Sequence, residues 1–257
     1  MSVTPQPSRV TILVKALPQP SVKHGETVCC AGLTAEGEWK RLYPVRFRHL
    51  SGESSFKRWD WVEFNYRKPT RDARGESCHV FEDTIRVDGH LRKEGRGPLL
   101  VRALQPSIEA AASAGCSLAV IRPTNTKFSH RRKSSADLAE EKAAFERAAR
   151  QKSFLDDDLR ALQPTPYEFN FSFEDNRKHT FTCGDWEAHA MFYKERQRTS
   201  EEEALRWMSE TFNEKYPEAG MLFAVGNQAK RPQTWQLLGV LRVEGLDGLT
   251  SQQGFGF

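Results

Sequence analysis

The sequence predicts an α+β protein in which a small β-barrel is followed by a second α+β module with a β-hairpin and two helices. Two observations lead to this class. Short apolar or alternating runs recur at close spacing in the first half, which favours a barrel over βαβ units. Helical periodicity becomes prominent only later in the chain. With 257 residues, 38% hydrophobic and 28% charged, the chain is long enough for two cores.

The strands expected in the first half follow one another with only turns between them. Residues 10–14 are apolar and β-branched, which is typical of a strand buried on both faces. Residues 59–66, WDWVEFNY, alternate between large apolar and polar side chains, so one face of that strand should be buried. Further strands are expected at residues 27–33, 39–44 and 79–87.

The second half combines helix-start signals with strands. Ser134 with Asp137 can begin a helix that reaches about residue 152, and Ser200 with Glu203 forms a capping box. Asp185 stands where a helix cap belongs. Residues 167–173 form a strand whose alternate side chains are aromatic, and residues 221–225 and 235–241 form a hairpin. We therefore predict a barrel domain at 1–133, a helical connector at 134–164 and a second α+β domain at 165–257.

Composition and missing motifs exclude several classes of protein. The mean hydropathy is −0.64 and no apolar run approaches the roughly 20 residues that a spanning helix needs, so no membrane partner is expected. The polar first residues lack the features of a signal peptide, and the five cysteines form no CxxC, so a cytoplasmic location is expected. P-loop, GxGxxG, GxSxG, HExxH and deaminase motifs are absent. No catalytic residue, metal ligand or cofactor is therefore assigned, and the favoured hypothesis is not an enzyme.

Positive charge is concentrated in one aromatic stretch. The whole chain carries a net charge of +4, whereas ten basic and five acidic residues between Glu38 and Arg74 give that segment +5. Cations attract phosphates, and interleaved aromatic rings offer faces on which unpaired bases stack. The alternative is that the rings are inward strand residues with solvated cations on the other face. The candidate nucleic-acid-binding residues are Trp39, Lys40, Arg41, Tyr43, Arg46, Arg48, Lys57, Arg58, Arg71 and Arg74.

A second interpretation uses the carboxylates and imidazoles near residue 185. Asp185, Glu187 and His179 could form the centre of a metal-dependent nuclease or hydrolase, and His179, Cys183 and His189 could also bind a metal. The structural alternative is that Asp185 caps a helix and Glu187 lies in its first turn, where the helix dipole favours an acid. A third interpretation is a protein-interaction module whose aromatic residues bury against a partner.

Short motifs occur at residues 27–32, 39–45, 56–60, 72–77, 185–187, 223–227 and 235–240. Together they resemble uncharacterised bacterial proteins described as dual OB-containing. The resemblance implies OB-like modules and an accessory role, in association with nucleic acid, near mobile-element or antiphage defence genes. It carries over no catalytic residue. Such relatives are expected to hold a Cys/His group before the Asp-Trp-Glu motif, but residues 173–179 contain no cysteine, which makes a zinc there doubtful.

The favoured hypothesis is therefore a cytoplasmic, non-enzymatic protein that binds single-stranded or structured nucleic acid. Arg41, Arg46, Arg48, Lys57 and Arg58 would hold phosphates, with Trp39 and Tyr43 as stacking candidates. Its expected partners are DNA or RNA, with a protein from the same gene system as a further candidate.

Overall fold

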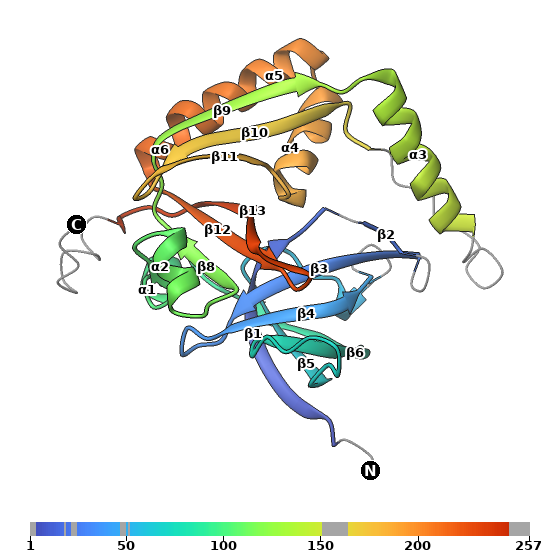
Figure 1. The fold of residues 1–257 in the computed structure, drawn as a ribbon, viewed down its shortest axis with the longest axis vertical. Helices are drawn as coiled ribbons and strands as arrows, with labels where there is room; N and C mark the ends of the chain where they lie inside the picture. The colour runs from blue at the N-terminus through green and yellow to red at the C-terminus, as the bar shows by residue number, and fades with distance from the viewer. Residues whose placement is uncertain are drawn as a thin grey trace.

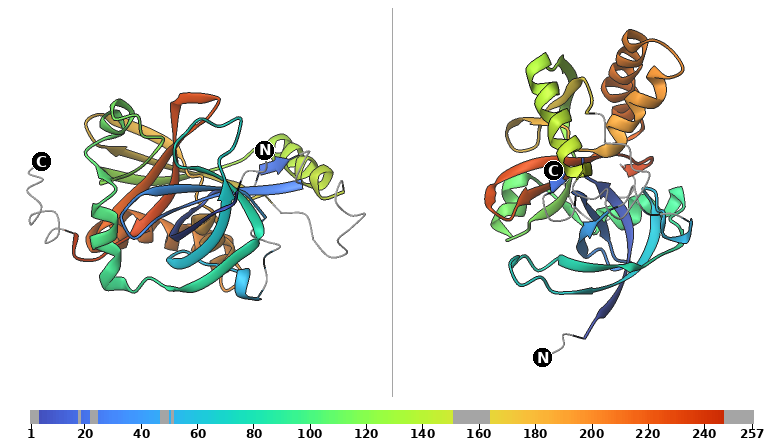
Figure 2. Two further views of the ribbon diagram at one scale, coloured as in Figure 1. Left: turned by 90° about the horizontal axis from the view of Figure 1, so that it is seen from below. Right: turned by 90° about the vertical axis from the view of Figure 1, so that its right-hand side faces the viewer.

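The computed structural model describes residues 4–17, 19–21, 25–46, 50, 52–150 and 164–246. It is an α+β structure built from three sheets: a ring of strands lies lowest in Figure 1, a four-stranded sheet lies in the middle and a three-stranded sheet lies at the top. Figure 2 shows that β1 extends away from the helices, toward the N-terminus. None of the described helices is long and apolar enough to cross a membrane.

The first half of the chain forms a ring-like sheet of five strands. The strand order is β1-β5-β6-β4-β3, and an antiparallel pairing of β1 with β3 closes the ring. The short strand β2 (Gln19–Ser21) pairs with the start of β3, and a 3₁₀ turn covers Gly52–Ser54. The five strands are β1 (Gln6–Lys15), β3 (Gly25–Leu33), β4 (Trp39–Val45), β5 (Asp60–Arg67) and β6 (Ser77–His90).

Alternation along the strands fills the inside of this ring. Val62, Phe64 and Tyr66 of β5 are buried, as the alternating run predicts, and Leu42 of β4 joins them. Residues on the opposite side of each strand point away from this core. β1 is buried from Val10 to Lys15, which confirms the expectation of a strand covered on both faces.

The middle sheet joins the two halves of the chain. Its order is β13-β12-β8-β7, with β7 (Leu104–Gln105), β8 (Leu118–Ile121), β12 (Met221–Gln228) and β13 (Arg231–Arg242). Leu222 and Ala224 of β12 face the ring, whereas Phe223 and Val225 face the opposite way. The sheet is therefore covered on both sides. We call the cluster on the ring side the shared core; it includes Leu13, Val14, Ala31, Leu33, Trp59, Leu99, Leu100, Leu118, Val120, Leu222, Ala224, Leu238 and Leu241.

Aromatic side chains hold the upper sheet onto its helices. Tyr167, Phe169, Phe171 and Phe173 alternate along β10 and are all buried, which confirms the predicted one-sided strand. Their rings pack against Phe192, Phe212 and Phe223. The elements are β9 (Thr124–Arg132), β10 (Tyr167–Glu174), β11 (Lys178–Thr182), α4 (Trp186–Arg196), α5 (Glu201–Glu210), a π-helical turn (Thr211–Lys215) and α6 (Tyr216–Ala219).

Helix starts follow the signals in the sequence. The Asp185 side chain accepts a hydrogen bond from the Glu187 N–H at the start of α4, and Ser200 with Glu203 forms a complete capping box on α5. α3 (Ser135–Arg150) begins after Ser134, whose hydroxyl accepts from the Asp137 N–H at 3.1 Å. Three predicted segments lie outside the described residues. They are the end of that helix near residue 152, most of the second half of the connector at 134–164, and the tail after residue 246.

Two arrangements were not expected from the sequence. β8 and β9 precede residue 133, yet β8 pairs with β12 and β9 with β10, so both belong to sheets of the C-terminal half. α1 (Lys93–Val101) forms although it contains Gly95, Gly97 and Pro98, which all disfavour helix. The short helix α2 (Ile108–Ser113) follows it. Burial of Leu99 and Leu100 in the shared core explains α1, because tertiary packing outweighs local propensity.

One histidine is enclosed in the core of the upper sheet. His189 of α4 is 5% exposed, its Nε2 lies 3.2 Å from the Cys183 carbonyl and its Nδ1 lies 2.7 Å from the Thr165 hydroxyl. These partners suit a neutral ring that donates from Nε2 and accepts at Nδ1. Burial lowers the pKa of His189 to about 4.

We expect this histidine to make the protein less stable in acid. The unfolded chain binds a proton at His189 below about pH 6.5, whereas the folded protein binds it only below about pH 4. The free energy of unfolding therefore falls by roughly 3 kcal/mol as the pH is lowered across that window. Urea unfolding between pH 4.5 and 7 should show a smaller fall in His189→Gln than in the wild type. The exposed His130→Gln is the control for loss of an imidazole; an equal fall in all three proteins would contradict the prediction.

Candidate functional site

Arg58 is not on the surface but in an ion pair that joins the ring to the C-terminal half. Its Nη2 lies 2.6 Å from Asp185 Oδ1, and its Nη1 donates to the Val240 carbonyl at 3.0 Å. The second Asp185 oxygen accepts from the Val240 N–H at 2.9 Å. Burial alone would lower the pKa of Arg58, but the Asp185 carboxylate outweighs it and raises the pKa. Arg58 is thus a cross-link between β13, α4 and the segment before β5.

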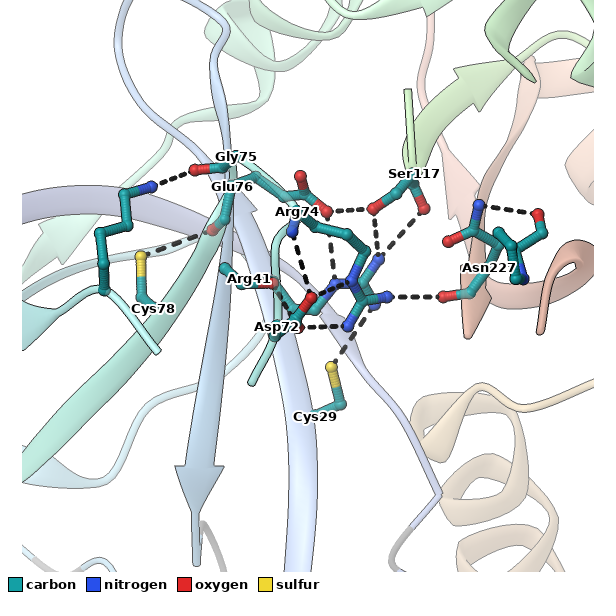
Figure 3. Close-up of polar contacts among 12 residues, drawn as sticks. Cys29, Arg41, Asp72, Arg74, Gly75, Glu76, Cys78, Ser117 and Asn227 are labelled. Atoms are coloured by element: carbon teal, nitrogen blue, oxygen red, sulfur yellow. Dashed lines mark hydrogen bonds and ion pairs between the residues drawn. The ribbon is translucent and has the colours of Figure 1, made fainter. Parts of the chain in front are cut away.

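Arg41 lies in a second buried polar cluster, shown in Figure 3. Its side chain is 7% exposed and its Nη2 donates to both the backbone carbonyl and the hydroxyl of Ser117, at 3.1 and 3.2 Å. Glu76 lies 3.6 Å from its Nε and also accepts from the Ser117 hydroxyl. The cluster connects β4 of the ring with the residue before β8, so this guanidinium is occupied inside the protein.

Arg74 anchors the loop between β5 and β6 onto the hairpin β12–β13. It forms an ion pair with Asp72 at 2.7 Å and donates to the Asn227 carbonyl at 2.9 Å (Figure 3). Burial would raise the pKa of Asp72, but hydrogen bonds from Arg74 and Ser77 lower it to about 2. Because Asn227 belongs to β12, this contact brings the tip of the loop beside the hairpin turn.

The other predicted residues have mixed environments. Arg46 pairs with Glu82 at 2.6 Å and Lys40 with Glu38 at 3.3 Å. Trp39 is half-buried against the shared core, and its indole nitrogen has no hydrogen-bond partner among the described residues. Lys57 and Arg71 are exposed, and Arg48 lies outside the described residues. The ten residues are therefore not one continuous surface.

Tyr43 does belong to an aromatic and basic surface on the outside of the ring. It is 43% exposed and stands opposite His79 of β6, which in turn stands opposite Arg67 of β5. The next row on the same face pairs Asn65 with Phe81. We call these five residues, Tyr43, Asn65, Arg67, His79 and Phe81, the outer patch. They alternate with the inward Leu42, Phe64, Tyr66, Cys78 and Val80, which fixes their direction.

Exposed cations lie on the loop that follows β5 and on the hairpin that contacts this loop. Lys68 and Arg71 follow β5, and Lys230 and Arg231 lie at the turn of the β12–β13 hairpin that Arg74 holds against the same loop. Lys68 donates to the Gly75 carbonyl. Within the described residues none of these four cations has a carboxylate partner. The loop and hairpin thus add positive charge that is available to a ligand.

Sequence reasoning missed Arg67, His79 and the hairpin cations. A signal for Arg67 was present, because continuing the alternation of buried Phe64 and Tyr66 by one residue places it on the opposite face. The part played by Lys230 and Arg231 depends on a contact between residues 153 positions apart, which no local pattern shows.

Asp185, Glu187 and His179, which were proposed for a metal centre, each form contacts with other residues. Glu187 pairs with Lys15 at 2.6 Å and Asp185 with Arg58, whereas His179 Nε2 lies 2.8 Å from Asp175 and its ring stacks on Phe173. No group of three or more histidine, cysteine, aspartate or glutamate side chains that could hold a metal occurs in the described part of the chain. The geometry gives no particular support to the hydrolase interpretation.

We expect the Arg58–Asp185 pair to be essential for stability. Asp185→Ala should lower the free energy of unfolding by roughly 3–5 kcal/mol, because it leaves a buried guanidinium and the Val240 N–H without their acceptor. The exposed Arg71→Ala should change stability by no more than about 0.5 kcal/mol. Urea unfolding measures both; a loss below about 1 kcal/mol in Asp185→Ala would contradict a structural cross-link at this position.

Comparison with known families divides the chain near the end of α1. Residues 6–101 match the family described as Domain of unknown function (DUF8758), and residues 101–255 match the family described as Domain of unknown function (DUF8757). No curated protein matches the chain. The protein therefore consists of two domains of unknown function, and since the second match covers more than half of its length, the chain belongs to the family described as Domain of unknown function (DUF8757).

Proposed function

We propose that this protein binds nucleic acid, with a preference for single strands, through the outer patch and the cations beside it. The observation that carries the proposal is the row formed by Tyr43, His79 and Arg67 across three neighbouring strands. Aromatic faces stack on unpaired bases of any sequence, each worth roughly 1–3 kcal/mol, and adjacent cations follow the phosphates. Tyr43 supplies an exposed ring, and Arg67 a cation in the same row.

The topology of the ring supports the idea that it is an OB-like barrel. Numbering only its five strands along the chain gives the closed order 1-2-3-5-4-1, with the third and fifth parallel. OB-folds are five-stranded Greek-key barrels that bind oligonucleotides on the second and third strands and on the loops 1–2 and 4–5. Here the third strand, β4, carries Tyr43, and the 4–5 loop carries Lys68 and Arg71.

The proposal assigns different roles to the arginines than the sequence suggested. Arg41, Arg58 and Arg74 have partners inside the protein, so releasing any of them to a phosphate would leave a carboxylate without its cation. In this proposal they position the loop and the hairpin. The nucleic-acid strand is contacted instead by five other cations: Arg67, Lys68, Arg71, Lys230 and Arg231. Much of the outer face of β3 is buried in the shared core, which leaves the Tyr43 end of the sheet for a ligand.

The biological setting of such binding rests on the resemblance to dual OB-containing bacterial proteins. It favours an accessory role in a defence or mobile-element system, with DNA or RNA as the partner. A protein from the same system remains the alternative partner, and its binding would be insensitive to nuclease treatment.

We expect binding that weakens steeply with salt and depends on the outer patch. Arg67→Ala with Arg71→Ala should weaken binding of every sequence and reduce the slope of log affinity against log salt by about 1.4, because each phosphate contact contributes roughly 0.7 on single strands. Tyr43→Ala should lower affinity by roughly 1–3 kcal/mol with the salt slope unchanged. Fluorescence anisotropy with single- and double-stranded DNA and RNA at several salt concentrations measures all three quantities.

The matched control removes two exposed cations elsewhere on the molecule. Lys127→Ala with Arg198→Ala changes the net charge by the same amount without touching the outer patch. An equal loss in both double variants would show that net charge alone drives binding. Absence of binding to any of the four nucleic acids at low salt would overturn the proposal.

A further inference from the structure

A pocket of about 310 Å³ lies where the ring meets α1, α4 and β13, away from the outer patch. Its lining comes from both halves of the chain and includes Trp59, Lys93, Arg96, Met191 and Tyr216. This volume lies at the lower end of the range of roughly 300–1,000 Å³ that small-molecule sites occupy. It suits a compact organic molecule and is too small for a folded polymer segment.

The charged groups of the pocket leave two cations without an ion pair. Two carboxylates line the pocket, and both have partners: Glu244 pairs with Arg242 at 3.0 Å and Glu187 with Lys15 at 2.6 Å. Arg58 is paired with Asp185. Lys93 and Arg96 also line the pocket, and among the described residues neither forms an ion pair within 4 Å. Burial lowers the pKa of Arg96, and the nearby carboxylates of Glu94 and Glu244 offset this effect only in part. A ligand with negative charge would complete this arrangement.

A chain of hydrogen-bond contacts holds Arg96 in position. Asp60 Oδ1 lies 2.7 Å from His90 Nδ1, and His90 Nε2 lies 3.2 Å from Arg96 Nη2. A proton on Nδ1 leaves Nε2 as an acceptor for the guanidinium. Arg96 Nε donates to the Leu91 carbonyl at 3.4 Å. The remaining N–H groups of the guanidinium are left for a ligand, and their planar fork matches two oxygens of one anion.

The wall beneath Arg96 is an aromatic residue in an uncommon backbone conformation. Trp59 has φ of 74°, in the left-handed region that a bulky residue rarely occupies. Its N–H donates to the Ile12 carbonyl at 2.8 Å and its carbonyl accepts from the Leu91 N–H at 2.7 Å. The Arg96 guanidinium carbon stands 4.5 Å from the centre of the indole ring. Such strain, of order 1–3 kcal/mol, persists where surrounding structure enforces it and is frequent at ligand sites.

We propose that this pocket binds a small organic phosphate monoester. A monoester carries close to two negative charges at neutral pH, which matches Lys93 and Arg96, and its oxygens suit the guanidinium fork. Met191, Tyr216 and Trp59 would contact the organic part of the molecule. The phosphate could belong to a free nucleotide or to the 5′ end of a strand, and these two sources share the same recognised group.

Calorimetric titration of the full chain can test this site. The probes are inorganic phosphate, adenosine, adenosine 5′-monophosphate, and a short oligonucleotide with either a 5′-phosphate or a 5′-hydroxyl. We expect the monophosphate or the 5′-phosphorylated oligonucleotide to bind more tightly than its unphosphorylated counterpart, by about tenfold or more. Preference for the free nucleotide identifies the first source, and preference for the phosphorylated strand end identifies the second.

Variants then locate the binding. The exposed Lys93→Ala should weaken the phosphorylated probe about tenfold, since it removes one of the two unpaired cations. The exposed Arg92→Ala removes the neighbouring cation outside the pocket lining and should change affinity less than about twofold. Arg96→Gln is the second variant, with urea unfolding as its folding control.

Three results would overturn the site. They are no binding of either phosphorylated probe at about 10 mM, which corresponds to a negligible affinity; equal affinity for phosphorylated and unphosphorylated probes; and equal effects of Lys93→Ala and Arg92→Ala. Binding of inorganic phosphate alone would overturn the organic part of the proposal. Because Lys93 lies outside the outer patch, loss of phosphate binding in Lys93→Ala with normal strand binding would separate this inference from the proposed function.

Discussion

The relative position of the two halves of this protein depends on one buried carboxylate. Asp185 caps α4, accepts a hydrogen bond from the Val240 N–H and forms an ion pair with Arg58. A single side chain thus fixes a helix start, the edge strand β13 of the middle sheet and the chain just before β5. Burying two opposite charges costs free energy, and separating the pair once it is buried costs more. Such a pair therefore favours one arrangement of the groups more than it adds to the stability of the fold. Trp59, the next residue along the chain from Arg58, forms one wall of the pocket.

Both apolar and polar contacts hold the two halves of the chain together. The shared core supplies non-directional burial from both sides of the middle sheet. Arg41, Arg58 and Arg74 supply directional contacts around it, each reaching a carbonyl of the C-terminal half: Ser117, Val240 or Asn227. Hydrophobic burial alone would tolerate small rotations of the ring, whereas three guanidinium groups on three separate carbonyls allow few. The outer patch and the hairpin cations depend on that restriction for their relative position.

Local features of the fold were readable from the sequence and contacts across the fold were not. The aromatic alternation at residues 167–173, the Asp185 cap and the Ser200 capping box each lie within a few residues of chain, and all three are confirmed. The roles of Arg41 and Arg58 depend on partners 76 and 127 residues away. A basic, aromatic stretch looks the same in sequence whether its guanidinium groups meet phosphates or internal carboxylates. For Tyr43, strand alternation gave the direction of the side chain, but only the pairing with His79 and Arg67 gave its neighbours.

The shared core has a consequence for how such a protein can be inherited. Leu13, Leu33 and Trp59 come from the segment that matches one family, and Leu222, Leu238 and Leu241 from the segment that matches the other. Each segment alone would present one half of this core to water, as an apolar surface that favours association with other chains. A gene that kept only one segment would therefore need a substitute partner with a matching apolar face. We expect the two segments to travel together through evolution, as one chain or as two that assemble.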